Sequence, residues 1–185
     1  MIRFLILYLI LLCPSALLAQ ANEDGFTVSS PADYWVKEEV EGGYMWRRQA
    51  PGQEYWDSAF FIVQVFVYNQ NIPIDRILAK FQSEEGYDDV ELSRYLAEIR
   101  EFKDAQCVFY DGEKLNPEVS GESNTDFVQR TKGYECLYPF PSTEEDTVIV
   151  NIGFSERLPK SRSDISFATE AQQFFDNFQF VELTQ

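Results

Sequence analysis

The chain has 185 residues, of which 31 are acidic and 15 basic, and its net charge at pH 7 is −16. A field of this sign repels phosphate backbones, which argues against nucleic acid as a partner. The chain contains no histidine. This excludes serine or cysteine nucleophiles activated by histidine, and zinc or iron sites that require histidine ligands.

Residues 1–21 have the pattern of a cleavable signal peptide. Arg3 precedes a nine-residue apolar run at residues 4–12, and small residues follow at Ala19 and Ala21. We expect cleavage after Ala19 or Ala21, and a periplasmic or secreted protein. The alternative is an uncleaved anchor, but a spanning helix needs about 20 apolar residues. Cys13 follows a leucine within the signal, so we do not expect a lipoprotein.

The first part of the mature chain predicts a meander of strands. A glycine pair at residues 42–43 marks one turn, and residues 50–53 mark another. The run at residues 59–68 is apolar on both alternating faces, which is typical of a central strand covered on both sides. The earlier strands are expected at residues 26–28, 34–37 and 44–47.

The hydrophobic period then changes to that of helices. Apolar residues recur with helical spacing from Ile74 to Phe81, directly after Pro73, which a first helical turn tolerates. A second helix is predicted between Asp88, a candidate N-cap, and Phe102. Its apolar stripe comprises Leu92, Tyr95, Leu96, Ile99 and Phe102.

Strands are predicted to resume at residues 106–110. A polar loop follows, and residues 126–131 and 134–138 then indicate a hairpin that turns at Lys132 and Gly133. Residues 147–154 indicate another strong strand, followed by a polar stretch at 155–163. The last helix has a buried stripe, and a short strand is expected at 180–183. The stripe comprises Phe167, Ala168, Ala171, Phe174, Phe175 and Phe178.

This order predicts an α+β fold, because strands and helices occur in groups and do not alternate strictly. We expect one domain at residues 22–185, a mainly antiparallel sheet with helices packed on both faces (an α/β/α sandwich).

Two sequence segments resemble the PsbP-like fold. The first runs from Gly25 to Trp35 with Phe26, Val28 and Pro31; the second is the aromatic stripe up to Phe180. That group includes extrinsic photosystem proteins, a Ran-binding nuclear import factor and bacterial envelope proteins of the DcrB type. The resemblance implies a small binding or accessory module.

Cys107 and Cys136 are the two cysteines of the mature chain. An even number in an exported protein predicts one disulfide. Two buried thiols or a redox pair are the alternatives, although the chain has no C-x-x-C motif.

Candidate functional residues are acidic or aromatic. Pairs of carboxylates suffice for glycosidase-type hydrolysis, yet acidic runs on loops and helix starts are usually solvated. Tyr44, Trp46, Tyr55 and Trp56 are candidate contacts for a ligand or partner, and Trp56, in a polar turn, is expected to be the most exposed. The alternative is that one face of this aromatic group packs into the core. No pattern predicts a metal or a cofactor.

The sequence therefore predicts a small, acidic, non-catalytic binding or accessory protein of the cell envelope, with a protein or a small ligand as its partner. The alternatives are an extracytoplasmic hydrolase that uses an Asp/Glu pair, and a secreted inhibitor or host-directed factor.

Overall fold

The computed structural model describes residues 25–30, 32–48, 58–83, 92–115, 127–140, 146–159 and 167–182. The predicted signal peptide, Tyr55 and Trp56 lie outside these ranges. The strands are β1 (Phe26–Thr27), β2 (Trp35–Val40), β3 (Gly43–Arg48), β4 (Ser58–Tyr68), β5 (Leu92–Phe102), β6 (Ala105–Leu115), β7 (Phe127–Leu137), β8 (Thr147–Pro159) and β9 (Gln179–Phe180). The helices are α1 (Ile74–Gln82) and α2 (Ala168–Asn177).

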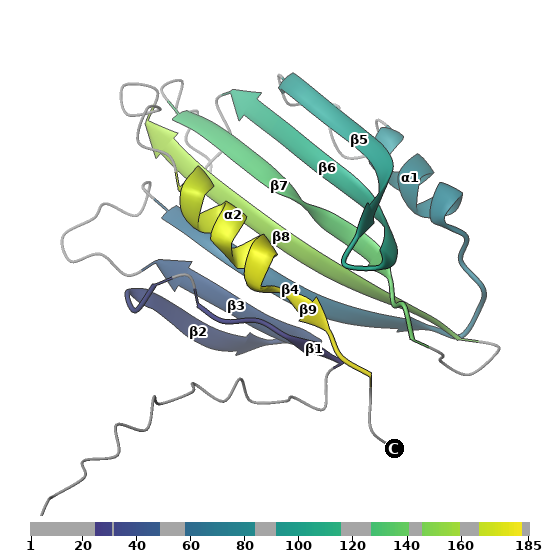
Figure 1. The fold of residues 1–185 in the computed structure, drawn as a ribbon. Coiled ribbons are helices and arrows are strands. Elements are labelled where there is room, and N and C mark those ends of the chain that lie inside the picture. The colour runs from purple at the N-terminus through teal and green to yellow at the C-terminus, as the bar shows by residue number, and fades with distance from the viewer. Residues whose placement is uncertain are drawn as a thin grey trace, which may run out of the picture.

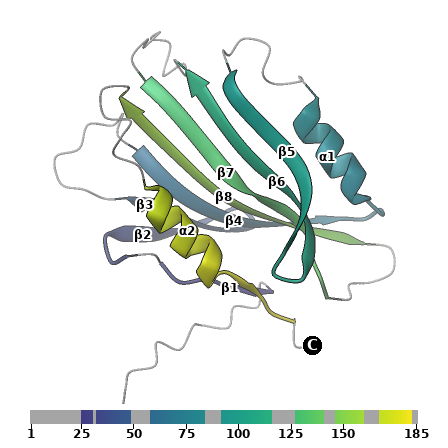
Figure 2. The same ribbon diagram turned by 45° about the horizontal axis from the view of Figure 1, so that its top comes forward.

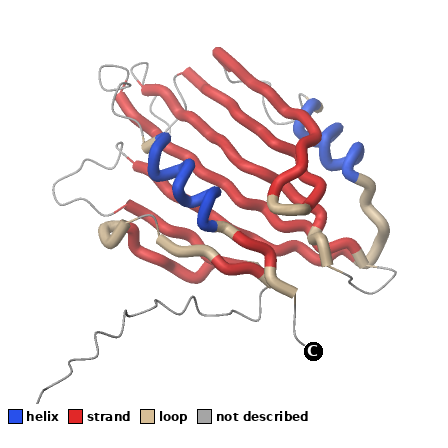
Figure 3. Tube along the Cα trace, viewed as in Figure 1, coloured by secondary structure: helices blue, strands red, loops and turns tan. Residues whose placement is uncertain are grey.

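One antiparallel sheet dominates the described part of the chain (Figures 1 and 3). Its strand order is β2-β3-β4-β8-β7-β6-β5, while β1 and β9 form a separate two-stranded pair. As predicted, the run that becomes β4 lies well inside the sheet, between β3 and β8. The strand is not covered on both sides, however: Ala59, Phe61 and Val63 are buried on one face, whereas Phe66 on the opposite face is exposed. Val67, near the end of the strand on the same face as Phe61, is exposed as well.

Helix α2 covers one face of the sheet and forms the main core with it (Figure 1). Its aromatic stripe was predicted correctly in all but one position, since Ala168 is exposed. Phe174 stacks on Phe61 of β4 at 4.5 Å between ring centroids and meets Trp46 of β3 edge-on at 5.3 Å. Burying rings of this size stabilises the fold by roughly 1.5–3 kcal/mol each, so this aromatic contact fixes α2 on the sheet.

The predicted α/β/α sandwich is wrong, because the described fold is mostly antiparallel sheet with two short helices. Helix α1 begins after Pro73, as predicted, and packs Ile74 and Ile77 against Val108 and Ile149. This small cluster lies on the face opposite α2, near β5 and β6 (Figure 2). The described residues therefore place one short helix on this face and do not cover it with a helical layer. None of the described helices is long and apolar enough to cross a membrane.

The helix predicted between Asp88 and Phe102 is also wrong, because residues 92–102 form β5. This strand pairs with β6 up to Phe102 and Ala105. The two residues between the strands, Lys103 and Asp104, both have positive φ, at 51° and 64°. A two-residue turn with both φ values positive matches the twist of a hairpin, so it favours a strand over a helix here. The apolar residues of β5 happen to recur at a spacing that also fits a helix.

The hairpin predicted at Lys132 and Gly133 does not exist, since β7 runs through both residues. Gly133 lies beneath the side chain of Tyr110, and a Cβ at this position would clash with the Tyr110 hydroxyl and the Ile152 carbonyl oxygen. The Tyr110 hydroxyl donates a hydrogen bond to Oδ1 of Asn151 at 3.2 Å. The glycine therefore provides room for an aromatic ring across the sheet and does not mark a turn.

Candidate functional site

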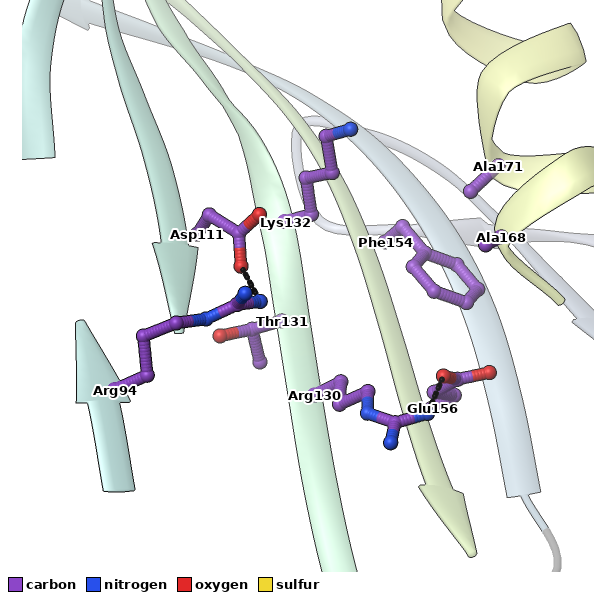
Figure 4. A pocket seen from close by; sticks show the side chains of 9 residues that line it. All are labelled: Arg94, Asp111, Arg130, Thr131, Lys132, Phe154, Glu156, Ala168 and Ala171. Carbon is purple, nitrogen blue, oxygen red and sulfur yellow. Dashed lines mark hydrogen bonds and ion pairs between the residues drawn. The ribbon is translucent and has the colours of Figure 1, made fainter. Parts of the chain in front are cut away.

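A cavity of about 170 Å³ lies where the first turn of α2 faces β6, β7 and β8 (Figure 4). Five charged residues line it: Arg94, Asp111, Arg130, Lys132 and Glu156. Its apolar lining includes Phe154 of β8 together with Ala168 and Ala171 of α2. The two alanines leave this space open, because a larger side chain at either position would extend into it.

The register of the sheet sets these side chains beside one another. Leu96, Asp111, Lys132 and Phe154 are successive cross-strand partners from β5 to β8. Because side chains alternate between faces along a strand, all four share the face that carries α2. Two charged residues therefore lie between two apolar ones on this row.

The neighbouring row contains Glu113, Arg130 and Glu156, and the last two of these line the cavity. Arg130 donates from Nε to Glu113 at 3.0 Å and from Nη1 to Glu156 at 3.4 Å. Burial acts to lower the pKa of Arg130, but the hydrogen bonds and charges of both glutamates outweigh it, so the pKa lies above its ordinary value. Arg130 thus remains a fixed cation in the wall.

Glu156 connects this row to the start of α2. It is only 2% exposed, and its Oε2 accepts a hydrogen bond from the backbone N–H of Phe167 at 2.9 Å. The N-terminus of a helix carries unpaired N–H donors and a partial positive charge, and a carboxylate satisfies both. Glu156 therefore holds the end of α2 that borders the cavity.

The remaining cations differ in their partners. Arg94 donates to Oδ1 of Asp111 at 2.8 Å, so these two charges are paired (Figure 4). Lys132 extends from β7 between Asp111 and Phe154. Among the described residues it makes no ion pair, and its ammonium lies 5.8 Å from the ring centroid of Phe109. The cavity therefore offers one cationic group that is not already paired with a carboxylate there.

The two carboxylates of the cavity do not form an acid–base pair of the kind that hydrolysis needs. Asp111 is paired with Arg94, and Glu156 is shared between Arg130 and the Phe167 N–H. In glycosidases both carboxyl groups face the scissile bond and one must donate a proton. The arrangement here suits holding a charged group more than it suits proton transfer.

The predicted disulfide is present. Cys107 of β6 and Cys136 of β7 are directly opposite each other, with an S–S distance of 2.08 Å, and both residues are fully buried. The bridge lies on the α2 face of the sheet, in the main core.

The two described members of the predicted aromatic group, Tyr44 and Trp46, do not line the cavity. Trp46 is 2% exposed and packs on Phe174, which supports the alternative that this face belongs to the core. Tyr44 is half-buried, and the Lys37 ammonium lies 3.5 Å from its ring centroid. Tyr55 and Trp56 are outside the described residues, so their role stays a prediction.

Sequence reasoning missed the charged residues of the cavity, although a signal for them exists. In β8, Phe154, Glu156 and Leu158 continue the alternation of Val150 and Ile152, so Glu156 occupies a core-facing position. In β7, Arg130 and Lys132 alternate in the same way once Gly133 is placed within a strand.

Comparisons with known proteins show the fold. No family model matches the chain, and no curated protein sequence matches it. The crystal structure of LpqN, a protein involved in cell envelope biogenesis of Mycobacterium tuberculosis, is similar to this structure, with a TM-score of 0.58 and 9% sequence identity. The match covers 88% of each chain, and the two proteins therefore share a fold over most of their length.

Proposed function

We propose that this protein is an exported, non-catalytic binding protein with an accessory role in the cell envelope, and that the cavity beside α2 is its ligand site. The observation that carries the proposal is that Arg94, Arg130 and Lys132 all line one cavity in a chain of net charge −16. The chain has 15 basic residues against 31 acidic ones, yet three of the five charged residues that line this cavity are basic.

The fold and the sequence support the same role. LpqN shares the fold and takes part in cell envelope biogenesis. The PsbP-like resemblance of the sequence implies a small binding or accessory module. The predicted signal peptide would deliver the mature chain to the periplasm or the medium, and the intact mass of the exported protein, lacking 19 or 21 residues, tests this.

The cavity can be closed by a single substitution at its rim. Ala168 is exposed and lines the cavity, so Ala168→Trp would fill the space without disturbing the core. The adjacent residue Thr169 is also exposed and does not line the cavity, which makes Thr169→Trp a matched control.

The experiment exposes the mature protein and both variants to a small-molecule extract of the envelope and measures bound mass by native mass spectrometry. We expect the wild type and Thr169→Trp to retain a compound that Ala168→Trp does not. Equal retention by all three proteins would place binding elsewhere. No retention by any of them, from extracts of membranes and of the medium, would contradict the proposal.

A further inference from the structure

We propose that the ligand of this cavity is a small anion, a carboxylate or a phosphate monoester carried on a short apolar group, and that Lys132 binds its charged end. This rests on the proposed function, since it assigns a ligand class to the same cavity. The anion would be either a free molecule or the end of a longer lipid chain, because both present the same chemistry.

The charges of the cavity favour an anion. Arg94 and Arg130 are already paired with carboxylates, whereas the Lys132 ammonium makes no ion pair among the described residues. Asp111, its neighbour on β6, accepts a hydrogen bond from Arg94 at 2.8 Å. A bound anion would therefore complete the pairing of the cavity without displacing an existing ion pair. A bound cation would meet the Lys132 ammonium, and both carboxylates that line the cavity are already paired with arginines.

The size and the apolar lining favour a short apolar group next to that charge. A cavity of about 150 Å³ lined by apolar side chains is large enough for benzene, and the cavity here measures about 170 Å³. Phe154, Ala168 and Ala171 line the side next to α2. Drug-sized ligands occupy pockets of roughly 300–1,000 Å³, so a larger ligand would place only one end inside.

Leu96 offers a surface for the rest of a longer chain. It is 42% exposed and lies at the other end of the row, on the edge strand β5, beside Asp111. A longer chain that runs from its charged end at Lys132 outward along the row, and not toward Phe154, would reach this leucine. A free short anion would not.

The test uses hexanoate, hexyl phosphate, hexanol and hexylammonium as probes, with dissociation constants measured by NMR titration of the mature protein. The two anions should bind at least about tenfold more tightly than hexanol, because a hydrogen bond between charged groups contributes that much. Hexylammonium should bind no better than hexanol. Dodecanoate distinguishes the two sources of the anion. If it binds more tightly than hexanoate and Leu96→Ala reduces the difference, the ligand is the end of a lipid chain. If the two bind equally, the ligand is a free small anion.

Variants assign the charge preference to Lys132. Lys132→Met keeps the length of the side chain and should lower anion affinity about tenfold while leaving hexanol binding unchanged. Lys132→Arg should retain the preference. Lys37→Met makes the same change of net charge on a different part of the sheet, at β2, and should have no effect.

The outcomes separate this inference from the proposed function. If hexanol binds as tightly as hexanoate, or if Lys132→Met keeps the full preference for anions, the ligand is not an anion held by Lys132. The cavity remains the ligand site in that case, provided that Ala168→Trp still blocks binding. If no probe and no envelope compound binds in a manner sensitive to Ala168→Trp, the cavity is not a ligand site and both proposals fail.

Discussion

The carboxylate of Glu156 accepts a hydrogen bond from the backbone N–H of Phe167, which ties β8 to the start of α2 at a distance of 2.9 Å. The same carboxylate accepts a second hydrogen bond from Arg130 at 3.4 Å. One nearly inaccessible side chain thus joins two strands of the sheet to the helix that covers it.

Glu156→Ala should lower the free energy of unfolding by about 3 kcal/mol, because removing one partner of a buried charged pair leaves the other groups unsatisfied. Glu156→Gln keeps an acceptor for the Phe167 N–H and should cost less, about 1 kcal/mol. Urea denaturation followed by circular dichroism measures both. Glu113→Gln is the control, since Glu113 bonds the same arginine from a more exposed position. A similar loss in Glu113→Gln and Glu156→Ala would show that the link to α2 contributes little.

Removing the disulfide should destabilise the protein by about 3.5 kcal/mol, given the 29 residues that separate Cys107 from Cys136. The variant is the double substitution Cys107→Ala and Cys136→Ala, compared with the wild type in urea. Wild-type protein treated with a reductant during unfolding should approach the midpoint of the double variant. An unchanged midpoint in both experiments would mean that the bridge does not form in the exported protein.

Glu170 gives the protein a defined dependence on pH. Its carboxylate, in the first turn of α2, accepts a hydrogen bond from the Tyr34 hydroxyl, and burial raises the pKa of Glu170. The folded state therefore keeps the proton on Glu170 to a higher pH than the unfolded state does. The contribution of Glu170 to the free energy of unfolding is thus fully present at low pH and is lost as the pH rises.

We expect the stability of the wild type relative to Glu170→Gln to fall as the pH rises above the ordinary glutamate pKa of about 4.3, because glutamine does not titrate. Urea unfolding at several pH values measures the difference. Glu98→Gln, on the exposed edge strand β5, provides a control for general effects of charge. A stability difference between the wild type and Glu170→Gln that stays constant, or rises with pH, would contradict the raised pKa of Glu170.

The two tryptophans proposed as contacts should behave differently on substitution. Trp46→Ala should lower the free energy of unfolding by about 3–5 kcal/mol, because it opens a cavity beside Phe174. Trp56→Ala should leave the melting temperature nearly unchanged and weaken partner capture by more than about 1 kcal/mol. Calorimetry of both variants measures the two changes in stability. A large loss of stability in Trp56→Ala would show that Trp56 is part of the core.

Sequence patterns predicted the elements whose period was unambiguous. The aromatic stripe of α2, the apolar run of β4 and the helix after Pro73 all combine a clear period with adequate length. The pairing of Cys107 with Cys136 followed from their number and the expected compartment, and the register of β6 and β7 places them opposite each other.

The failures come from contacts between residues far apart in the sequence. The sequence around Gly133 indicates a turn, because the Tyr110 ring that needs the room is 23 positions away in the chain. The sequence of β5 indicates a helix, because its pairing with β6 is not visible in its own pattern. The cavity shares this origin, because Arg94, Lys132 and Glu156 meet only through the register of four strands. A charge pattern along one segment does not reveal a site built across several.

The pairing of Phe26 with Phe180 brings the beginning and the end of the described chain together. Both strands of this pair lie beyond the last turn of α2, whereas the cavity borders its first turn, about 15 Å away for a helix of ten residues (Figure 1). An affinity tag, a fluorophore or a surface tether attached next to either end of the described chain, at Gly25 or Glu182, would therefore leave from the same corner, at a distance from Lys132. Immobilised protein should keep its cavity open to solution in either orientation of attachment.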